Sequence, residues 1–123
     1  MNIKIRQEQI IDYSVVDNLI KCAFGNVEES DHTEHQLVGR LRKSDAFIPE
    51  LSLVAEVDEE KVVGHILLTK VKIVSENKSV ISLGVAPLSV LPEFQKQGIG
   101  GILLREAHSR ASRLGYDSAV LLG

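Results

Sequence analysis

The residue types best suited to chemistry lie in a glycine-rich stretch, Gln95–Gly101, between an apolar run that ends at Pro92 and an amphipathic helix. The order strand, turn, helix leaves backbone N–H groups without intrahelical acceptors at the start of a helix, where the peptide dipoles also favour an anion. Glycines at 98, 100 and 101 remove the Cβ atoms that would keep a bulky phosphate away from those amides. The stretch therefore predicts a phosphate-binding turn.

The spacing of the glycines argues against two common classes of phosphate-binding motif. A Walker loop requires G-x-x-x-x-G-K-[ST], and neither the lysine nor the hydroxyl residue follows Gly101. A dinucleotide fingerprint requires G-x-G-x-x-G, and its third glycine is missing here. The spacing thus disfavours P-loop nucleotide hydrolysis and also a flavin or nicotinamide domain. A strand-to-helix turn without a ligand is the structural alternative.

The glycine turn resembles motif A of the GNAT superfamily of acetyl-CoA-dependent N-acetyltransferases. That signature is [QR]-x-x-G-x-[GA] after a strand ending in V-x-P, and the chain reads Q-K-Q-G-I-G from Gln95 to Gly100, preceded by Val90–Pro92. The chain is also similar, over most of its length, to bacterial predicted N-acetyltransferases of the superfamily. The resemblance implies a mixed α/β fold: a central, mostly antiparallel sheet with a parallel βαβ crossover at the coenzyme site, in one domain spanning residues 1–123. A further helix and strands normally follow in the superfamily, so we expect the sequence to be C-terminally short.

The resemblance assigns acetyl-CoA to two segments of the chain. The turn would bind the coenzyme A pyrophosphate, chiefly through backbone amides, with Lys96, Gln97, Gly98, Ile99, Gly100 and Gly101. Strand residues Leu88, Ser89 and Val90 would hydrogen-bond the pantetheine arm as an added strand would. The N–H of Leu88 is the expected oxyanion donor. Pro87 cannot donate to a ladder, which fits a bulge where this strand parts from the strand after the helix.

Three candidates are open for the group that takes the proton from the acceptor amine. Some family members carry a glutamate eleven residues before the first glutamine of the motif, and this position is Gly84. His65, Glu56 and water relayed to solvent are the remaining alternatives, although a lone strand histidine is more often structural. The usual acid of the family is a tyrosine farther along the chain. Neither Tyr13 nor Tyr116 matches its place, so we assign no acid.

Composition limits the class of protein. The chain has 123 residues, 44% of them hydrophobic, which is enough for one domain with a core. Its formal net charge of -3 disfavours a general nucleic-acid-binding protein, and no apolar run approaches membrane-spanning length. One cysteine, Cys22, cannot form an internal disulfide, and no apolar signal segment opens the chain. We therefore expect a cytoplasmic protein.

Hydrophobic periodicity predicts the elements that position these residues. In chain order we expect a strand at 3–5, a helix at 16–24, a second helix ending near 43, strands at 51–57, 61–74 and 79–91, a helix at 99–114 and a strand at 118–122. Ser14 with Asp17, and Asp31 with Glu34, are approximate capping boxes for the first two helices. Cys22 is expected to be a small buried or half-buried side chain.

Together these features predict an N-acetyltransferase that moves the acetyl group of acetyl-CoA to a primary amine of a small molecule or protein. The alternative is a GNAT-fold module that binds acyl-CoA without efficient catalysis, as a sensor or interaction domain. The acidic residues between the first two helices, 25–35, lack the spacing of a metal site and are either a solvated loop or a surface that attracts a cationic acceptor. An unfinished sheet edge near Leu121 would allow a homodimer.

Overall fold

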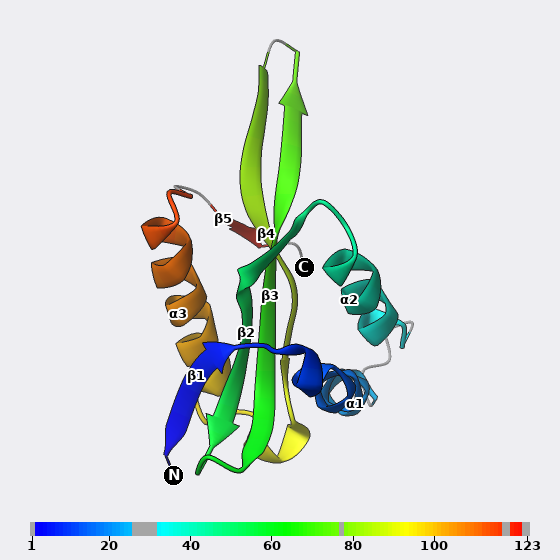
Figure 1. Cartoon of the computed structure of the whole chain (residues 1–123), viewed down its shortest axis with the longest axis vertical. Coiled ribbons are helices and arrows are strands. Elements are labelled where there is room, and N and C mark those ends of the chain that lie inside the picture. Colours follow the sequence, from blue (N-terminus) through cyan, green and yellow to red (C-terminus); the bar gives the residue numbers. More distant parts are fainter. Residues whose placement is uncertain (1, 26–31, 77, 117–118, 122–123) are drawn as a thin grey trace.

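A mixed five-stranded sheet with helices on both faces forms the fold, as Figure 1 shows. The computed structural model describes residues 2–25, 32–76, 78–116 and 119–121. In chain order the elements are β1 (Ile3–Gln7), α1 (Tyr13–Phe24), α2 (Glu34–Arg42), β2 (Phe47–Val57), β3 (Lys61–Ser75), β4 (Lys78–Val90), α3 (Ile99–Arg113) and β5 (Ala119–Leu121), with 3-10 turns at Ile10–Asp12 and Pro92–Phe94.

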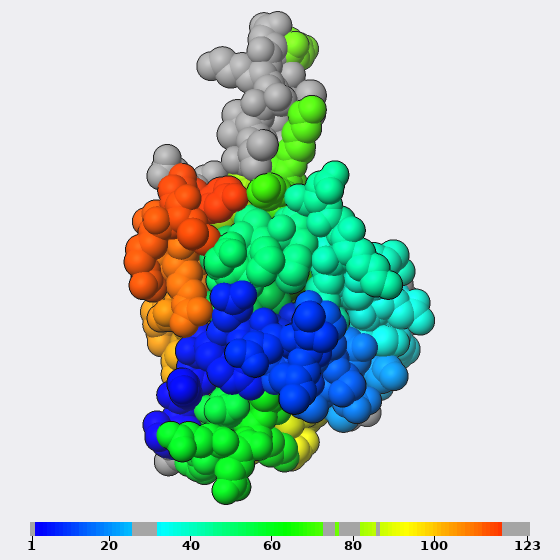
Figure 2. All heavy atoms as spheres, viewed as in Figure 1, coloured from blue at the N-terminus to red at the C-terminus, as the bar shows by residue number. Residues whose placement is uncertain are grey.

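The strands lie in the order β1-β2-β3-β4-β5, and only the β4–β5 pair is parallel. The connection from β4 through α3 to β5 is therefore the expected βαβ crossover, and the predicted mostly antiparallel sheet is confirmed. Strands β3 and β4 form a long hairpin that extends beyond the rest of the sheet (Figures 1 and 2). Among the described residues no helix is long and apolar enough to cross a bilayer.

The two faces of the sheet carry separate hydrophobic clusters, because successive strand residues point to opposite faces. Helix α3 covers one face and buries Ile99, Leu103, Ala107 and Ala111. Helices α1 and α2 cover the other face, where the cluster consists of Val16, Leu19, Ile20, Val38, Val54 and Leu67. Gly64 permits a close approach of α3, because a Cβ there would lie 2.9 Å from Cδ1 of Leu103.

Three local expectations are corrected by the structure. Ser14 does not begin the first helix: α1 starts at Tyr13 after a 3-10 turn in which the Asp12 carboxylate accepts a hydrogen bond from the Gln9 N–H at 2.8 Å. Cys22 is exposed, since it lies about 200° around the helix from the buried Ile20. Strand β2 begins at Phe47, earlier than predicted, because an irregular segment precedes its regular pairing with β3. Asp31, part of the second expected cap, lies outside the described residues.

Candidate functional site

The glycine turn presents free amides at the start of α3. Gly98 is the residue before the helix and has a φ of 84°, and Lys96 also has a positive φ, 64°. The Ile102 N–H makes the first intrahelical bond, to the Gly98 carbonyl at 3.0 Å. The amides of residues 99–101 therefore precede the helical ladder, and together with the left-handed residues they form an anion-binding concavity.

Two glutamine side chains connect this turn to the chain that precedes it, one to the last residue of β4 and one to the 3-10 turn after it. The Gln95 side chain donates to the Val90 carbonyl at 3.0 Å, and the Gln97 side chain donates to the Glu93 carbonyl at 3.3 Å. The first glutamine of the motif thus has a structural role that the sequence alone did not indicate. It ties the glycine turn to the end of β4.

The three glycines of the turn differ in what a side chain would meet. A Cβ at Gly98 would enter open space, whereas one at Gly100 would face Leu88 Cδ2 at 3.6 Å and Val90 Cγ2 at 4.0 Å. A Cβ at Gly101 would face the Arg105 guanidinium at 3.3 Å. A Cβ at Gly100 would thus face the sheet, and a Cβ at Gly98 would point into the open space beside the turn. The expectation that all three glycines clear space for phosphate stays a prediction.

A bulge in β4 sets which backbone groups point outward. Ile66 and Leu68 are two residues apart on β3, while their partners Leu88 and Val85 are three apart on β4. The extra β4 residue falls at 86–87, which confirms the bulge expected at Pro87.

Beyond the bulge the backbone directions alternate along β4. The Leu91 N–H donates to the Val63 carbonyl on β3 at 2.8 Å. Because N–H and C=O groups alternate sides along a strand, Ser89 also directs its backbone groups to β3, while Leu88 and Val90 direct theirs to the β5 side. The donation from Gln95 to the Val90 carbonyl agrees with this direction. The outward groups of Leu88 and Val90 thus lie on the strand that leads into the glycine turn.

The described pairing of β4 with β5 covers Leu83–Val85 on β4. The sequence predicts that the two strands part beyond this pairing, and the parting would leave a slot for the pantetheine arm. The residues of the last strand that would border it, 122–123, lie outside the described residues, so the slot stays a prediction.

His65 is fully buried on the α1/α2 face of the sheet. Its Nε2 lies 3.2 Å from Ser52 Oγ and 3.4 Å from Glu8 Oε2. Glu8 also accepts hydrogen bonds from Ser52 Oγ at 2.8 Å and from Arg42 Nη2 at 2.6 Å. Burial alone would raise the pKa of Glu8, but the hydrogen bonds from His65 and Arg42 outweigh burial and lower it to about 2.

The other candidates for a proton acceptor have different surroundings. Glu56 pairs with Arg6 at 3.2 Å, and Arg6 also binds Asp12 at 2.8 Å, so Glu56 belongs to a separate ion-pair group. Gly84 stands between Thr69 on β3 and Val120 on β5, where it supplies no side chain. Of the two candidate side chains, His65 contacts a carboxylate and Glu56 contacts an arginine.

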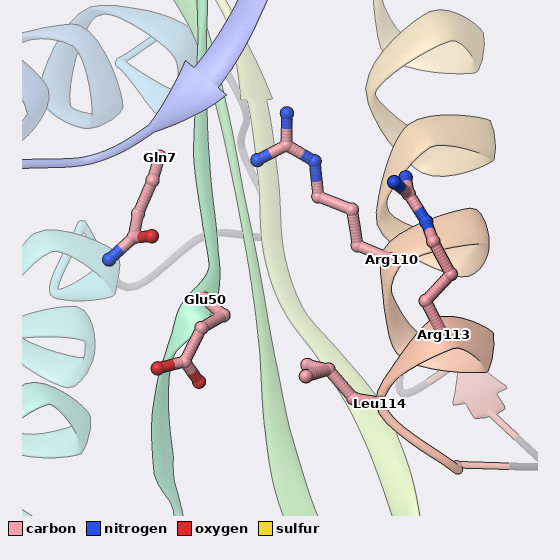
Figure 3. Close-up of a pocket in the computed structure, with 5 residues that line it drawn as sticks. All are labelled: Gln7, Glu50, Arg110, Arg113 and Leu114. Atoms are coloured by element: carbon pink, nitrogen blue, oxygen red, sulfur yellow. The ribbon is translucent and has the colours of Figure 1, made fainter.

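A pocket of about 270 Å³ lies away from the glycine turn, at the other end of α3. Figure 3 shows its lining residues: Gln7, Glu50, Arg110, Arg113 and Leu114. Arg110 is held by Glu106 at 2.9 Å and by the Ile5 carbonyl at 3.4 Å. The length of α3, about 20 Å for its 15 residues, separates this pocket from the turn.

A family model described as an acetyltransferase (GNAT) domain matches residues 49–122 of the chain, more than half of its length. The chain belongs to the GNAT family of acetyltransferases. It is 36% identical to a GNAT family acetyltransferase from Brucella melitensis whose crystal structure is in complex with acetyl-CoA. The two structures superpose with a TM-score of 0.88, and the match covers 99% of this chain and 76% of the Brucella chain. It is 30% identical to the Escherichia coli GNAT family N-acetyltransferase YhbS solved in complex with CoA, with a TM-score of 0.84, covering 100% of this chain and 63% of that one.

Curated relatives agree with this family. The uncharacterized N-acetyltransferase YjhQ of Escherichia coli (strain K12) is 38% identical over 112 residues, which are 91% of this chain and 59% of that protein. YhbS is 35% identical over 119 residues, which are 97% of this chain and 66% of YhbS. The chain thus spans about three fifths to two thirds of the length of these relatives.

Sequence reasoning found the turn and His65 but missed Glu8, Arg42 and Ser52. No local spacing connects these residues, since they come from the β1 end, α2 and β2. A charged pair at positions 8 and 42 carries no sequence signal of its own. Only the tertiary structure brings it to His65.

Proposed function

We propose that this chain is an acetyl-CoA-dependent N-acetyltransferase domain that acts on a primary amine of a small molecule or protein. The observation that carries the proposal is the continuity of two features: the outward backbone groups of Leu88 and Val90 run directly into the amide-rich turn opened by Gly98. The acetyl-CoA and CoA bound to the Brucella and YhbS structures support the same ligand for this chain.

Two parts of the chain would bind two parts of coenzyme A. Amides at the start of α3 would hold the pyrophosphate, with Lys96, Gln97, Gly98, Ile99, Gly100 and Gly101 around it. Leu88 and Val90 would pair with the pantetheine arm, whereas Ser89 turns its backbone groups to β3 and its side chain toward the α1/α2 face.

The chemistry requires a donor for the developing oxyanion and a proton acceptor. The outward N–H of Leu88 would stabilise the negative charge that forms on the thioester oxygen. Bound acetyl-CoA supplies the activated acetyl group. We propose His65 as the proton acceptor, supported by its buried carboxylate partner Glu8.

A non-catalytic acyl-CoA-binding module is the second candidate, favoured by Gly84 at the position where some family members carry glutamate. Measuring acetyl-CoA turnover with a panel of primary amines separates the two. Tight coenzyme binding without turnover by any amine would support the module. A cytoplasmic location is proposed as well, because the single cysteine is free and exposed.

Two matched glycine variants test whether the turn at the start of α3 binds the pyrophosphate of coenzyme A; we call this proposed site the cradle. Gly98 and Gly115 flank α3, both have positive φ (84° and 93°), and a Cβ at either would meet nothing within 4 Å. The replacements Gly98→Ala and Gly115→Ala should therefore cost similar backbone strain, on the order of 1 kcal/mol. Calorimetry should show coenzyme A binding weakened about 10-fold or more by Gly98→Ala alone, a loss of about 1.4 kcal/mol. Equal affinity in both variants would show that the assigned cradle is wrong.

A further inference from the structure

His65 belongs to a buried polar group that includes Glu8, Arg42 and Ser52. The side chains of Glu8 and Arg42 are 1% and 6% exposed, and that of His65 is 0% exposed. These charged groups sit beside the apolar α1/α2 cluster, where removing charges from water is costly unless they are paired. Among the described residues these contacts reach the imidazole at Nε2 and leave Nδ1 without a hydrogen bond.

The hydrogen bonds determine where the imidazole carries its proton. The single hydroxyl hydrogen of Ser52 is donated to the ionised Glu8 carboxylate at 2.8 Å. The His65 Nε2 therefore faces two acceptors, the Ser52 oxygen and Glu8 Oε2, and must itself donate. In neutral His65 the proton is on Nε2, and Nδ1 carries a basic lone pair.

Nδ1 of His65 is buried and has no hydrogen-bond partner among the described residues. The same is true of Oγ of Ser89. These two residues are direct cross-strand partners on β3 and β4, so their side chains lie on the same face of the sheet. The free lone pair and the free hydroxyl therefore belong to neighbouring side chains, and Ser89 immediately follows Leu88.

Charged groups from three parts of the chain form a series of contacts that reaches His65. Glu8, which follows β1, contacts His65 directly, Arg42 on α2 pairs with Glu8, and Asp17 on α1 lies 3.5 Å from Arg42. Their formal charges, two negative and one positive, leave one negative charge. The neighbouring Arg6 is occupied by Asp12 and Glu56. An imidazolium at His65 would neutralise the group.

We propose that Ser89 and His65 form a buried proton path that Glu8 positions and that ends beside the oxyanion donor Leu88. This inference rests on the proposed function. One N–H proton of the acceptor ammonium passes to the Ser89 oxygen while the Ser89 hydroxyl proton passes to Nδ1, directly or through a water. The neutral amine then forms the N–C bond as the C–S bond breaks, and its second proton goes through solvent to the departing thiolate. Glu8 is a positioning residue: it fixes the tautomer and balances the imidazolium.

The test measures acetyl transfer from acetyl-CoA to a panel of primary alkylamines and lysine-containing peptides as a function of pH. At neutral pH, His65→Gln should lower kcat about 100-fold, and Glu8→Gln and Ser89→Ala should each lower it about 10-fold, within the usual range for general-base catalysis. The KM for acetyl-CoA should stay within about threefold, because none of these side chains contacts the coenzyme in this scheme. The acidic limb of the kcat/KM profile should disappear in His65→Gln.

Two controls separate this role from a structural one. Ser89→Thr retains the hydroxyl and should restore most of the rate lost in Ser89→Ala. Asp12→Asn removes a carboxylate that is also paired with an arginine but does not contact His65, and it should change kcat by no more than about twofold.

Each outcome decides the inference. Turnover by the parent chain that His65→Gln retains, with an unchanged pH profile, would overturn the proton path and leave the proposed function standing. Absence of turnover with every amine, despite coenzyme binding, would overturn both. A nitrogen NMR spectrum that places the neutral imidazole proton on Nδ1 would overturn the path whatever the rates.

Discussion

Glu8 should make the free energy of unfolding depend on pH by an amount that its lowered pKa predicts. Its pKa is lowered from 4.5 to about 2 by its partners. A carboxylate with a lowered pKa in the folded state stabilises the protein above the unfolded value, 4.5, and this stabilisation is lost as the pH falls toward 2. The two values correspond to about 3 kcal/mol in total, of which about 2 kcal/mol should be lost between pH 7 and pH 3.

Urea unfolding of the parent and of Glu8→Gln at pH 7, 5, 4 and 3 measures this contribution. The free-energy difference between them should shrink by about 2 kcal/mol across the series, most of it below pH 4.5. Glu50→Gln removes an exposed carboxylate without these partners and serves as the control, with a pH dependence close to that of the parent. A Glu8→Gln variant that loses stability with acid as steeply as the parent would refute the reasoning.

Three further predictions concern stability and the acyl-transfer strand. Gly64→Ala should destabilise the fold by about 1 kcal/mol or more in urea unfolding, because its Cβ meets α3 at 2.9 Å, whereas Gly39→Ala, with nothing within 4 Å, should stabilise α2 by about 0.5–1 kcal/mol. Leu88→Pro, which removes the proposed oxyanion donor, should lower kcat about 100-fold more than Leu88→Ala, which keeps it, in steady-state acetylation assays. Arg42→Met should cost about 3 kcal/mol or more by leaving Glu8 buried and less well paired, while Arg113→Met, whose side chain is 68% exposed, should be near neutral in the same unfolding assay.

The sequence was informative where the signal is local. The turn at 95–101 is contiguous, and its function depends on backbone conformation that glycine and helix position dictate, so it could be predicted without the fold. The pairing of β2, β3 and β4 could be predicted from their hairpin connections, and that of β4 with β5 from the helix between them. The place of β1 beside β2 could not, because α1 and α2 separate the two strands in the sequence. The glycine positions alone could not show the direction of each missing Cβ, which differs between Gly98, Gly100 and Gly101.

The residues of the proposed proton path and their partners could not be found in the same way. His65 was visible as an unusual residue in an apolar strand, but its partners are distant in sequence: Glu8 and Ser52 are 44 residues apart, and Glu8 and Arg42 are 34 apart. Their contact depends on how β1 leads into α1 beside β2 and on how α2 packs. Propensity and periodicity report neither of these arrangements.

The register of β4 joins the two halves of the site. Leu88 and Val90 face α3 with their side chains and the β5 side with their backbone groups, and Ser89 between them has the opposite orientation, toward His65. Because the side-chain period of a strand is two, a shift of one residue would place a leucine against the imidazole and turn the serine amide to the coenzyme side. The extra residue at 86–87 prevents that shift while leaving the hairpin below it paired. The bulge therefore aligns the edge of β4 that we propose for the coenzyme with the buried carboxylate–imidazole pair.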